Sequence, residues 1–375
     1  MVRFSDLAKQ YLEIQPEIDQ AISAVMREAA FVGGRYVREF EEAFASYQQA
    51  QHCVGVANGT DALEIVLEAL ELPTGSEVIV PANTFIATSE AVTRSGLKVV
   101  FCDCREDDYT ISVEDAARRV TSRTRAIIPV HIYGHPCDMD PLLSLADQHG
   151  LKIIEDCAQA HGAEYKGRRV GALGAAGTFS FYPGKNLGAY GDAGGIVTNA
   201  PELAKKCRMI ANHGRVDKYD HVMEGRNSRL DGLQAAVLAV KLKHLEDWIA
   251  RRTRVAARYL EGLKDMPEIT LPGAAAWARH TWHLFVIRTD CRDLLKSALE
   301  AQGIQTGIHY PTALPKLKAY AYLGQAGEPL FANRADNSLL SLPMGEHLEE
   351  REVDETCRAV RLFYKEARPT ANSAK

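Results

Sequence analysis

The chain has 375 residues, with 44 Lys and Arg against 49 Asp and Glu, so its formal net charge is −5. Hydrophobic residues make up 46% and charged residues 25% of it, values that exclude a disordered or collagen-like chain and fit two domains. The charge balance argues against a nucleic-acid partner, because no basic excess is available to displace counterions from phosphates.

After an N-terminal helical arm (1–30), short β-rich runs alternate with helical patterns. The predicted strands are residues 53–58, 76–82, 97–103, 125–134 and 151–155. The predicted helices between them are residues 60–72, 84–96, 111–120 and 138–150. Because parallel neighbours need crossover connections, this alternation predicts an α/β fold with a mostly parallel sheet flanked by helices.

The second half of the chain begins with a Gly-dense stretch at 171–199, where two short strands are expected around an ordered loop. A helix at 201–210 and a long one at 230–263 follow, and the long helix is expected to link a large domain to a smaller one. The predicted domains are 1–245 and 246–375, with a flexible tail from about 366. The small domain is expected to be α+β, with a β-α-β unit made of residues 281–287, 292–302 and 303–311.

Eight scattered cysteines form no C-x-x-C pair, so we expect free core thiols rather than disulfides or zinc. The first 20 residues lack the apolar region of a signal peptide. No apolar run reaches the ~18–20 residues that cross a bilayer. We therefore expect a cytoplasmic protein with no membrane partner.

The residues that follow the strands are the first candidates for chemistry, because ligands of parallel α/β sheets bind beyond the carboxyl ends of the strands. Asn58-Gly59-Thr60-Asp61 opens the helix after the first strand, where free N–H groups can bind an anion. The alternative is that Thr60 or Asp61 only caps the helix.

Two further residues complete the requirements of pyridoxal phosphate. Asp156 follows the apolar strand 151–155, and Lys185 lies in a turn rich in glycines and aromatics, where burial favours Schiff-base chemistry. A helix N-terminus can bind the phosphate, an aspartate can keep the pyridine nitrogen protonated, and a lysine can bond the aldehyde carbon. The three together predict a site for this cofactor.

The chain also resembles a known family from about residue 4 to about residue 350. The resemblance is carried by the motifs NGTDAL, EDCAQAHGA, FSFYPGKNLGAYGDAGG, NSRLDGLQAA, GIHYP and LSLPM, in this order. They are similar to the DegT/StrS group of nucleotide-sugar aminotransferases, which are fold-type-I enzymes with the aspartate-aminotransferase-like fold. The resemblance implies pyridoxal phosphate as cofactor, with pyridoxamine phosphate as its alternate form, and a homodimer with active sites shared across the interface.

The resemblance also implies roles for individual residues. Lys185 would bond the cofactor and move the proton in catalysis. The cofactor would be bound by Asp156 at the pyridine nitrogen, by Gln159 beside the 3′-oxygen, by Gly59, Thr60 and Ser180 at the phosphate, by Phe85 on the ring, and by Asn227 from the other subunit. Arg229, His309 and Tyr310 resemble residues that line the nucleotide-sugar pocket.

Several positions leave alternatives open. Arg229 could instead pair with Asp231, and His309 could be a structural histidine. His131 and His135 are four residues apart, but no Glu accompanies them in H-E-x-x-H form, so we expect no metal site. The sequence departs from the family at Gly184, at 311–316 and at 344–346, and the last two stretches are expected to edge the sugar pocket.

The implied reaction is a ping-pong transfer of an amino group, from L-glutamate to the keto carbon of a nucleotide-diphosphate-linked sugar. The motifs resemble the 3-keto-sugar enzymes, which favours C3 of a substrate such as a dTDP-3-keto-6-deoxyhexose. The alternatives are a UDP-3-oxo-uronate, a 4-keto sugar, a lyase acting on free amino acids, or a protein of this fold that senses a ligand without catalysis.

Overall fold

A computed structural model describes residues 1–367 of the chain. Its centre is a seven-stranded sheet with the strand order β1-β9-β8-β5-β4-β2-β3. These strands are β1 (His52–Val56), β2 (Glu77–Pro81), β3 (Lys98–Cys102), β4 (Thr124–Ile127), β5 (Lys152–Asp156), β8 (Ala176–Ser180) and β9 (Gly194–Thr198). Within this sheet β9 runs antiparallel to both of its neighbours and the other pairs are parallel, as predicted for an α/β fold.

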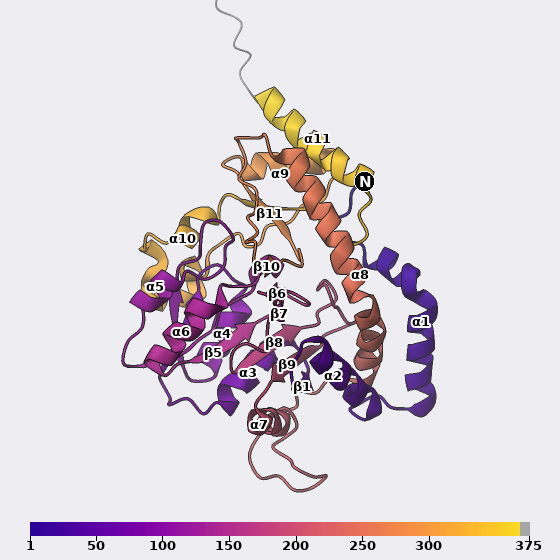
Figure 1. Cartoon of the computed structure of the whole chain (residues 1–375), viewed down its shortest axis with the longest axis vertical. Helices are drawn as coiled ribbons and strands as arrows, with labels where there is room; N and C mark the ends of the chain where they lie inside the picture. The colour runs from indigo at the N-terminus through magenta and orange to yellow at the C-terminus, as the bar shows by residue number, and fades with distance from the viewer. Residues whose placement is uncertain (368–375) are drawn as a thin grey trace, which may run out of the picture.

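Helices cover both faces of this sheet (Figure 1). The α-helices are α1 (Leu7–Glu28), α2 (Arg35–Tyr47), α3 (Gly59–Ala69), α4 (Ile86–Arg94), α5 (Val113–Arg118), α6 (Met139–His149), α7 (Pro201–Ala211), α8 (Gly232–Leu263), α9 (Arg292–Ala301), α10 (Phe331–Ala335) and α11 (Glu350–Ala367). Short 3-10 turns are η1 (Ile132–Gly134), η2 (Leu314–Lys316), η3 (Lys318–Leu323) and η4 (Gln325–Gly327). Along β2, Val78 and Val80 pack into one core and Ile79 into the other, because successive strand residues face opposite sides.

A third core lies at the end of the molecule that carries α9 and α11 (Figure 1). It joins the second half of α8 to these helices and to the antiparallel pair β11 (Phe285–Arg288) and β12 (Leu339–Leu342). The remaining strands, β6 (Glu164–Tyr165), β7 (Arg168–Arg169) and β10 (Ala278–Arg279), form a small sheet of their own. Because α8 runs unbroken through residue 245, the predicted domain division falls inside one helix. The predicted helical arm is α1, which packs along α8, and the tail beyond α11 (368–375) lies outside the described residues.

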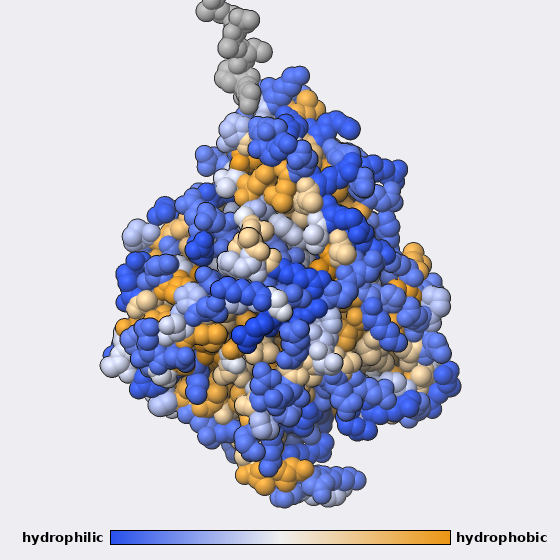
Figure 2. All heavy atoms as spheres, viewed as in Figure 1, coloured by the Kyte–Doolittle hydropathy of each residue, from blue (hydrophilic) through white to orange (hydrophobic). Residues whose placement is uncertain are grey.

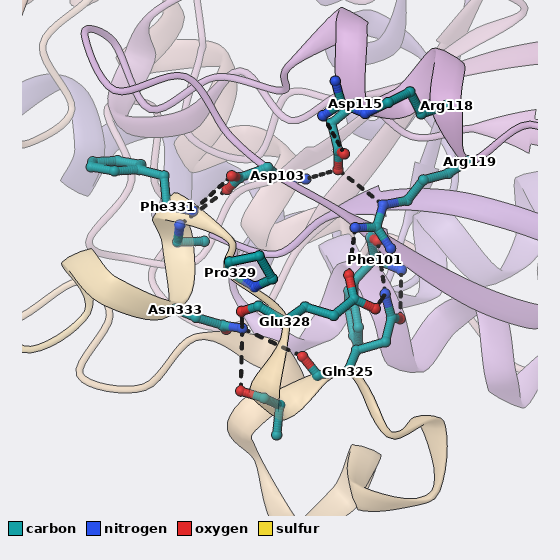
Figure 3. Close-up of polar contacts among 12 residues, drawn as sticks. Phe101, Asp103, Asp115, Arg118, Arg119, Gln325, Glu328, Pro329, Phe331 and Asn333 are labelled. Atoms are coloured by element: carbon teal, nitrogen blue, oxygen red, sulfur yellow. Dashed lines mark hydrogen bonds and ion pairs between the residues drawn. The ribbon is translucent and has the colours of Figure 1, made fainter.

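The segment with η4 and α10 packs against the edge of the large sheet (Figure 3). The side-chain amide of Gln325 accepts a hydrogen bond from the Phe101 N–H and donates one to the Phe101 carbonyl, both at 3.1 Å. In this way the Gln325 side chain pairs with the edge strand β3 as a neighbouring strand would. Asp103 accepts the N–H groups of Phe331 and Ala332 at 2.7 and 3.0 Å, which caps α10. These contacts fix the segment that follows residue 311 against the large sheet.

One predicted strand is too long and another is wrong. The strand predicted at 125–134 ends at Ile127, because Pro129 lacks an N–H and the chain turns into η1. Residues 303–311 form no strand of a β-α-β unit; their backbone pairs with β12 through one bridge, between Gly307 and Ser341. The small sheet is instead the antiparallel pair β11 and β12.

The face of the molecule in Figure 2 is mostly polar, with an apolar patch at the end where the loop after α7 protrudes. That loop exposes Val216, Tyr219 and Val222, of which Tyr219 is 83% accessible. Within residues 1–367, no helix is both long and apolar enough to span a bilayer.

Candidate active site

Lys185 lies in the loop between β8 and β9, at the carboxyl edge of the central sheet. The loop closes tightly: the N–H of Lys185 donates to the Tyr182 carbonyl at 2.8 Å, and a Cβ on Gly188 would lie 2.3 Å from the Pro183 oxygen. Within the described chain, Nζ of Lys185 makes no hydrogen bond. Burial lowers the pKa of Lys185 to about 8, while the charge of Asp156 acts in the opposite direction. The result is an amine that is partly neutral near pH 8.

Asp156 is the last residue of β5 and is buried. One carboxylate oxygen accepts the N–H of Ala158 at 3.1 Å, and the other accepts the hydroxyl of Thr88 at 2.8 Å. Burial raises the pKa of Asp156, and these two hydrogen bonds and the Lys185 charge act against that rise. Each carboxylate oxygen keeps a further acceptor position, because an ionised carboxylate offers about four.

Gln159 links this strand end to Tyr133 and Tyr310. Its Oε1 accepts the N–H of Tyr133 at 2.7 Å, so the other end of the amide must be the donor, and Nε2 donates to the Tyr310 hydroxyl at 2.9 Å. The Tyr133 hydroxyl in turn donates to the carbonyl of His309. The hydroxyl proton of Tyr310 therefore remains free to donate to a further group.

His309 and Phe85 border the same region. Burial, followed by the charge of Lys185, lowers the pKa of His309 to about 4, so its imidazole is neutral, with Nδ1 2.8 Å from the Ser341 hydroxyl. Phe85 precedes α4, and its ring is 54% exposed with its centre 5.7 Å from that of Tyr310. An exposed aromatic face of this kind can stack on a flat ligand.

The start of α3 lies directly against the end of β8. A Cβ on Gly59 would lie 2.7 Å from the Cβ of Ser180, so only glycine allows this approach. Asn58, and not Thr60 or Asp61, caps the helix, by accepting the N–H of Asp61 at 2.8 Å. Since the cap is supplied by Asn58, the hydroxyls of Thr60 and Ser180 remain available beside a positive helix end.

Asn227 and Arg229 make no contact with these groups within residues 1–367. Asn227 forms a backbone bridge with Asn212, and Arg229 donates to the side-chain oxygen of Asn212 at 3.4 Å rather than pairing with Asp231. Asn227 lies at the base of the protruding loop.

Three polar groups beside the site were not singled out in the sequence. Thr88 lies in the N-T-F-x-A-T run and Tyr133 follows β4, and neither has a local signal for its partner. His283 pairs with the Oδ1 of Asn186, the residue after Lys185, at 3.1 Å. Since the Asn186 amide donates to the Thr281 carbonyl, Nδ1 of His283 carries the proton. Burial lowers the pKa of this imidazole well below its usual value.

One buried cluster has the composition of a metal site. Ligand atoms of His131, Glu155 and Cys157 lie within 4.8 Å of one another. Glu155 already accepts the N–H groups of Gly171, Leu173 and Gly174 and pairs with Nε2 of His131 at 3.1 Å. Nδ1 of His131 accepts the N–H of Cys137, so both residues are used in protein hydrogen bonds.

The stretches expected to edge the sugar pocket make structural ion pairs. Glu346 pairs with Arg252 at 2.8 Å, where both side chains are 7% exposed. Lys316 is the last residue of η2, the first helical turn after Tyr310, and it pairs with Asp336 at 2.8 Å. These two side chains are therefore engaged within the fold.

The residues present fit pyridoxal phosphate. Lys185 is half-buried and its amine makes no hydrogen bond within the described residues, so the amine is available to bond an aldehyde carbon. The Asp156 carboxylate is buried with acceptor positions to spare for a protonated ring nitrogen. The close contact between Gly59 and Ser180 places a helix N-terminus and a hydroxyl together for a phosphate.

Comparison with known proteins gives one consistent result. The profile of the DegT/DnrJ/EryC1/StrS aminotransferase family matches residues 12–361. The dTDP-3-amino-3,4,6-trideoxy-alpha-D-glucose transaminase of Streptomyces venezuelae is 47% identical over 96% of this chain and 95% of its own. The erythromycin biosynthesis sensory transduction protein EryC1 of Saccharopolyspora erythraea is 49% identical over 94% and 97%. The crystal structure of S. venezuelae DesV in complex with a ketimine intermediate superposes with a TM-score of 0.94, at 46% identity over 96% and 98%.

Proposed function

The chain belongs to the DegT/DnrJ/EryC1/StrS aminotransferase family, and we propose that it transfers the amino group of L-glutamate to C3 of a keto sugar carried on dTDP. It is a pyridoxal-phosphate-dependent enzyme. The observation that carries the proposal is the half-buried Lys185 amine, which has no hydrogen-bond partner within the described residues and lies in the field of Asp156 at the carboxyl edge of the sheet. Identity of 47% to a dTDP-3-amino-sugar transaminase over nearly the full length supports the sugar and the position.

When bound, the cofactor supplies an electron sink for the substrate carbon that loses or gains the amino group. Asp156 holds the proton on the ring nitrogen, which makes that sink effective. Lys185 moves the proton at the reacting carbon, and its pKa of about 8 lets Nζ accept a proton near neutral pH. The neutral His309 beside it adds no competing positive charge.

The cofactor's phosphate is proposed to bind the first turn of α3, through the N–H groups and hydroxyls of Gly59, Thr60 and Ser180. Phe85 would stack on the ring face, and Gln159 would lie by its 3′-oxygen. Asn227 is proposed to reach the phosphate of the other subunit. Support for this last assignment is its place at the base of a protruding loop with exposed apolar side chains.

The sugar is proposed to bind against Tyr310, His309 and Arg229. The Tyr310 hydroxyl oxygen already accepts a hydrogen bond from the Gln159 amide, and its proton is not used. That proton can be donated to a sugar hydroxyl or to a diphosphate oxygen. The guanidinium of Arg229 can bind a carboxylate or phosphate when a second chain covers the protruding loop after α7. A homodimer in the cytoplasm would satisfy these assignments, and the eight unpaired thiols fit that reducing compartment.

Glutamate and a panel of keto sugars on dTDP, UDP and GDP test the proposal. Glutamate should convert the bound cofactor to its pyridoxamine form, and a dTDP-3-keto-6-deoxyhexose should regenerate the starting spectrum and yield an amino sugar. Turnover of a UDP-3-oxo-uronate or a 4-keto sugar alone would replace the proposed substrate. The name of EryC1 gives a sensor as the second candidate. No spectral change with glutamate would favour that candidate.

A further inference from the structure

A short chain of hydroxyl groups ends on the Asp156 carboxylate. Thr88 donates to Oδ2 of Asp156 at 2.8 Å, and its own Oγ1 lies 3.1 Å from Oγ1 of Thr84. An ionised carboxylate can only accept, so the Thr88 proton points to Asp156 and the Thr84 hydroxyl must donate to Thr88. All three side chains are buried.

These hydroxyls come from a different element than the carboxylate. Thr84 and Thr88 flank Phe85 at the start of α4, whereas Asp156 ends β5. A carboxylate on a strand end can rotate about its last bond, and a second contact from a neighbouring helix removes that freedom. The hydrogen bond also stabilises the ionised form, which burial otherwise disfavours.

We propose that Thr88 is a positioning residue that sets the direction and the ionisation of the Asp156 carboxylate, with Thr84 orienting the Thr88 hydroxyl. This inference rests on the proposed function, since it assigns Asp156 to the ring nitrogen of the cofactor. Loss of the hydroxyl leaves Asp156 with one hydrogen bond from the protein and raises its pKa. The carboxylate then binds a protonated ring less well, and it loses its charge at a higher pH.

Other groups around Asp156 also influence its titration. Lys185 lowers the pKa of Asp156 by its charge, and the charge of Asp156 raises the pKa values of Tyr310, Cys137 and Cys157. None of them is altered by a change at Thr88, so a shift seen in a Thr88 variant reports on the hydroxyl.

The test uses the apoprotein and pyridoxamine phosphate, which cannot bond to Lys185, and measures its dissociation constant by fluorescence across a pH series. T88V keeps the shape and loses the hydroxyl, T88S restores the hydroxyl, and T93V makes the same change on the outer part of α4, where Thr93 bonds only the Glu90 carbonyl. We expect T88V to bind about tenfold more weakly, T88S to stay within about threefold of the unaltered protein, and T93V to match it. As the pH is lowered, the affinity of T88V should decline at a higher pH than that of the unaltered protein.

Equal affinity and an equal pH profile in T88V, even with a lower unfolding temperature, would overturn the proposal and leave Thr88 a packing residue. If T88V does not fold, the same measurement is made on T84V. A loss of about threefold in affinity for pyridoxamine phosphate supports the proposal, and unchanged affinity overturns it. An unaltered apoprotein that binds no pyridoxamine phosphate would instead refute the cofactor site, and so the proposed function itself.

Discussion

Glutamine in place of Glu346 should destabilise the protein strongly. Glu346 pairs with Arg252 at 2.8 Å and accepts from the Gln10 amide at 2.6 Å, joining α1, α8 and the end of β12. Breaking a buried ion pair costs about 3–5 kcal/mol, because one charge remains unpaired. We expect a loss of about 3 kcal/mol, since the glutamine oxygen can still accept one hydrogen bond from Arg252.

The measurement is equilibrium urea unfolding of the apoprotein. The matched control is E350Q, because Glu350 pairs with Arg258 at 2.6 Å while 80% exposed, and we expect it to cost at most about 0.5 kcal/mol. The double variant R252M/E346M should recover most of the loss, since neither charge remains. Similar small losses in E346Q and E350Q would refute the reasoning.

The pH dependence of this loss follows from the pKa of Glu346. Burial raises that pKa, but the Arg252 charge and the hydrogen bonds outweigh it, so the pKa lies below its ordinary value. A carboxylate of this kind stabilises the fold above its unfolded pKa and ceases to do so as the pH falls through its folded pKa. The deficit of E346Q should be constant between about pH 6 and 8 and shrink below about pH 4.

Three further changes test the site. G59A places a Cβ 2.7 Å from that of Ser180 and should cost about 1–3 kcal/mol of unfolding free energy, and an unchanged urea midpoint would contradict that contact. Uptake of pyridoxal phosphate by the apoprotein should quicken as the pH rises through the Lys185 pKa of about 8 and level off about one pH unit above it, where the amine is almost entirely neutral, and a flat profile between about pH 6 and 9 would be inconsistent with it. Y310F should raise the KM for the keto sugar about tenfold and leave the glutamate half-reaction unchanged, whereas an unaltered KM would exclude a sugar contact.

Local patterns predicted much of the fold. The unbroken apolar run of β2, which is buried on both faces, and the apolar spacing of α8 predicted the correct elements. For the strand predicted at 125–134, Pro129 was a signal in the sequence that the strand ends earlier, because proline lacks an N–H. For 303–311 no such local signal exists, because the pairing of β11 with β12 depends on tertiary packing.

Contacts between distant residues were not predictable in the same way. Gln325 lies 224 residues from the Phe101 backbone that it pairs with, and Glu346 lies 94 residues from Arg252. For the candidate site, Asp156 and Lys185 could be named from their places after strands of the sheet. Thr88 could not, because nothing near it in the sequence indicates a carboxylate partner.

The central claim is that the Lys185 amine bonds the cofactor. Lys241 is the matched control, because burial lowers its pKa to about 8 as well, while its amine donates to the Gly188 carbonyl at 2.7 Å. After reconstitution with pyridoxal phosphate, K241M should keep the visible absorption band of a lysine-bound cofactor, and K185A should lack it. A band that persists in K185A and disappears in K241M would contradict the account.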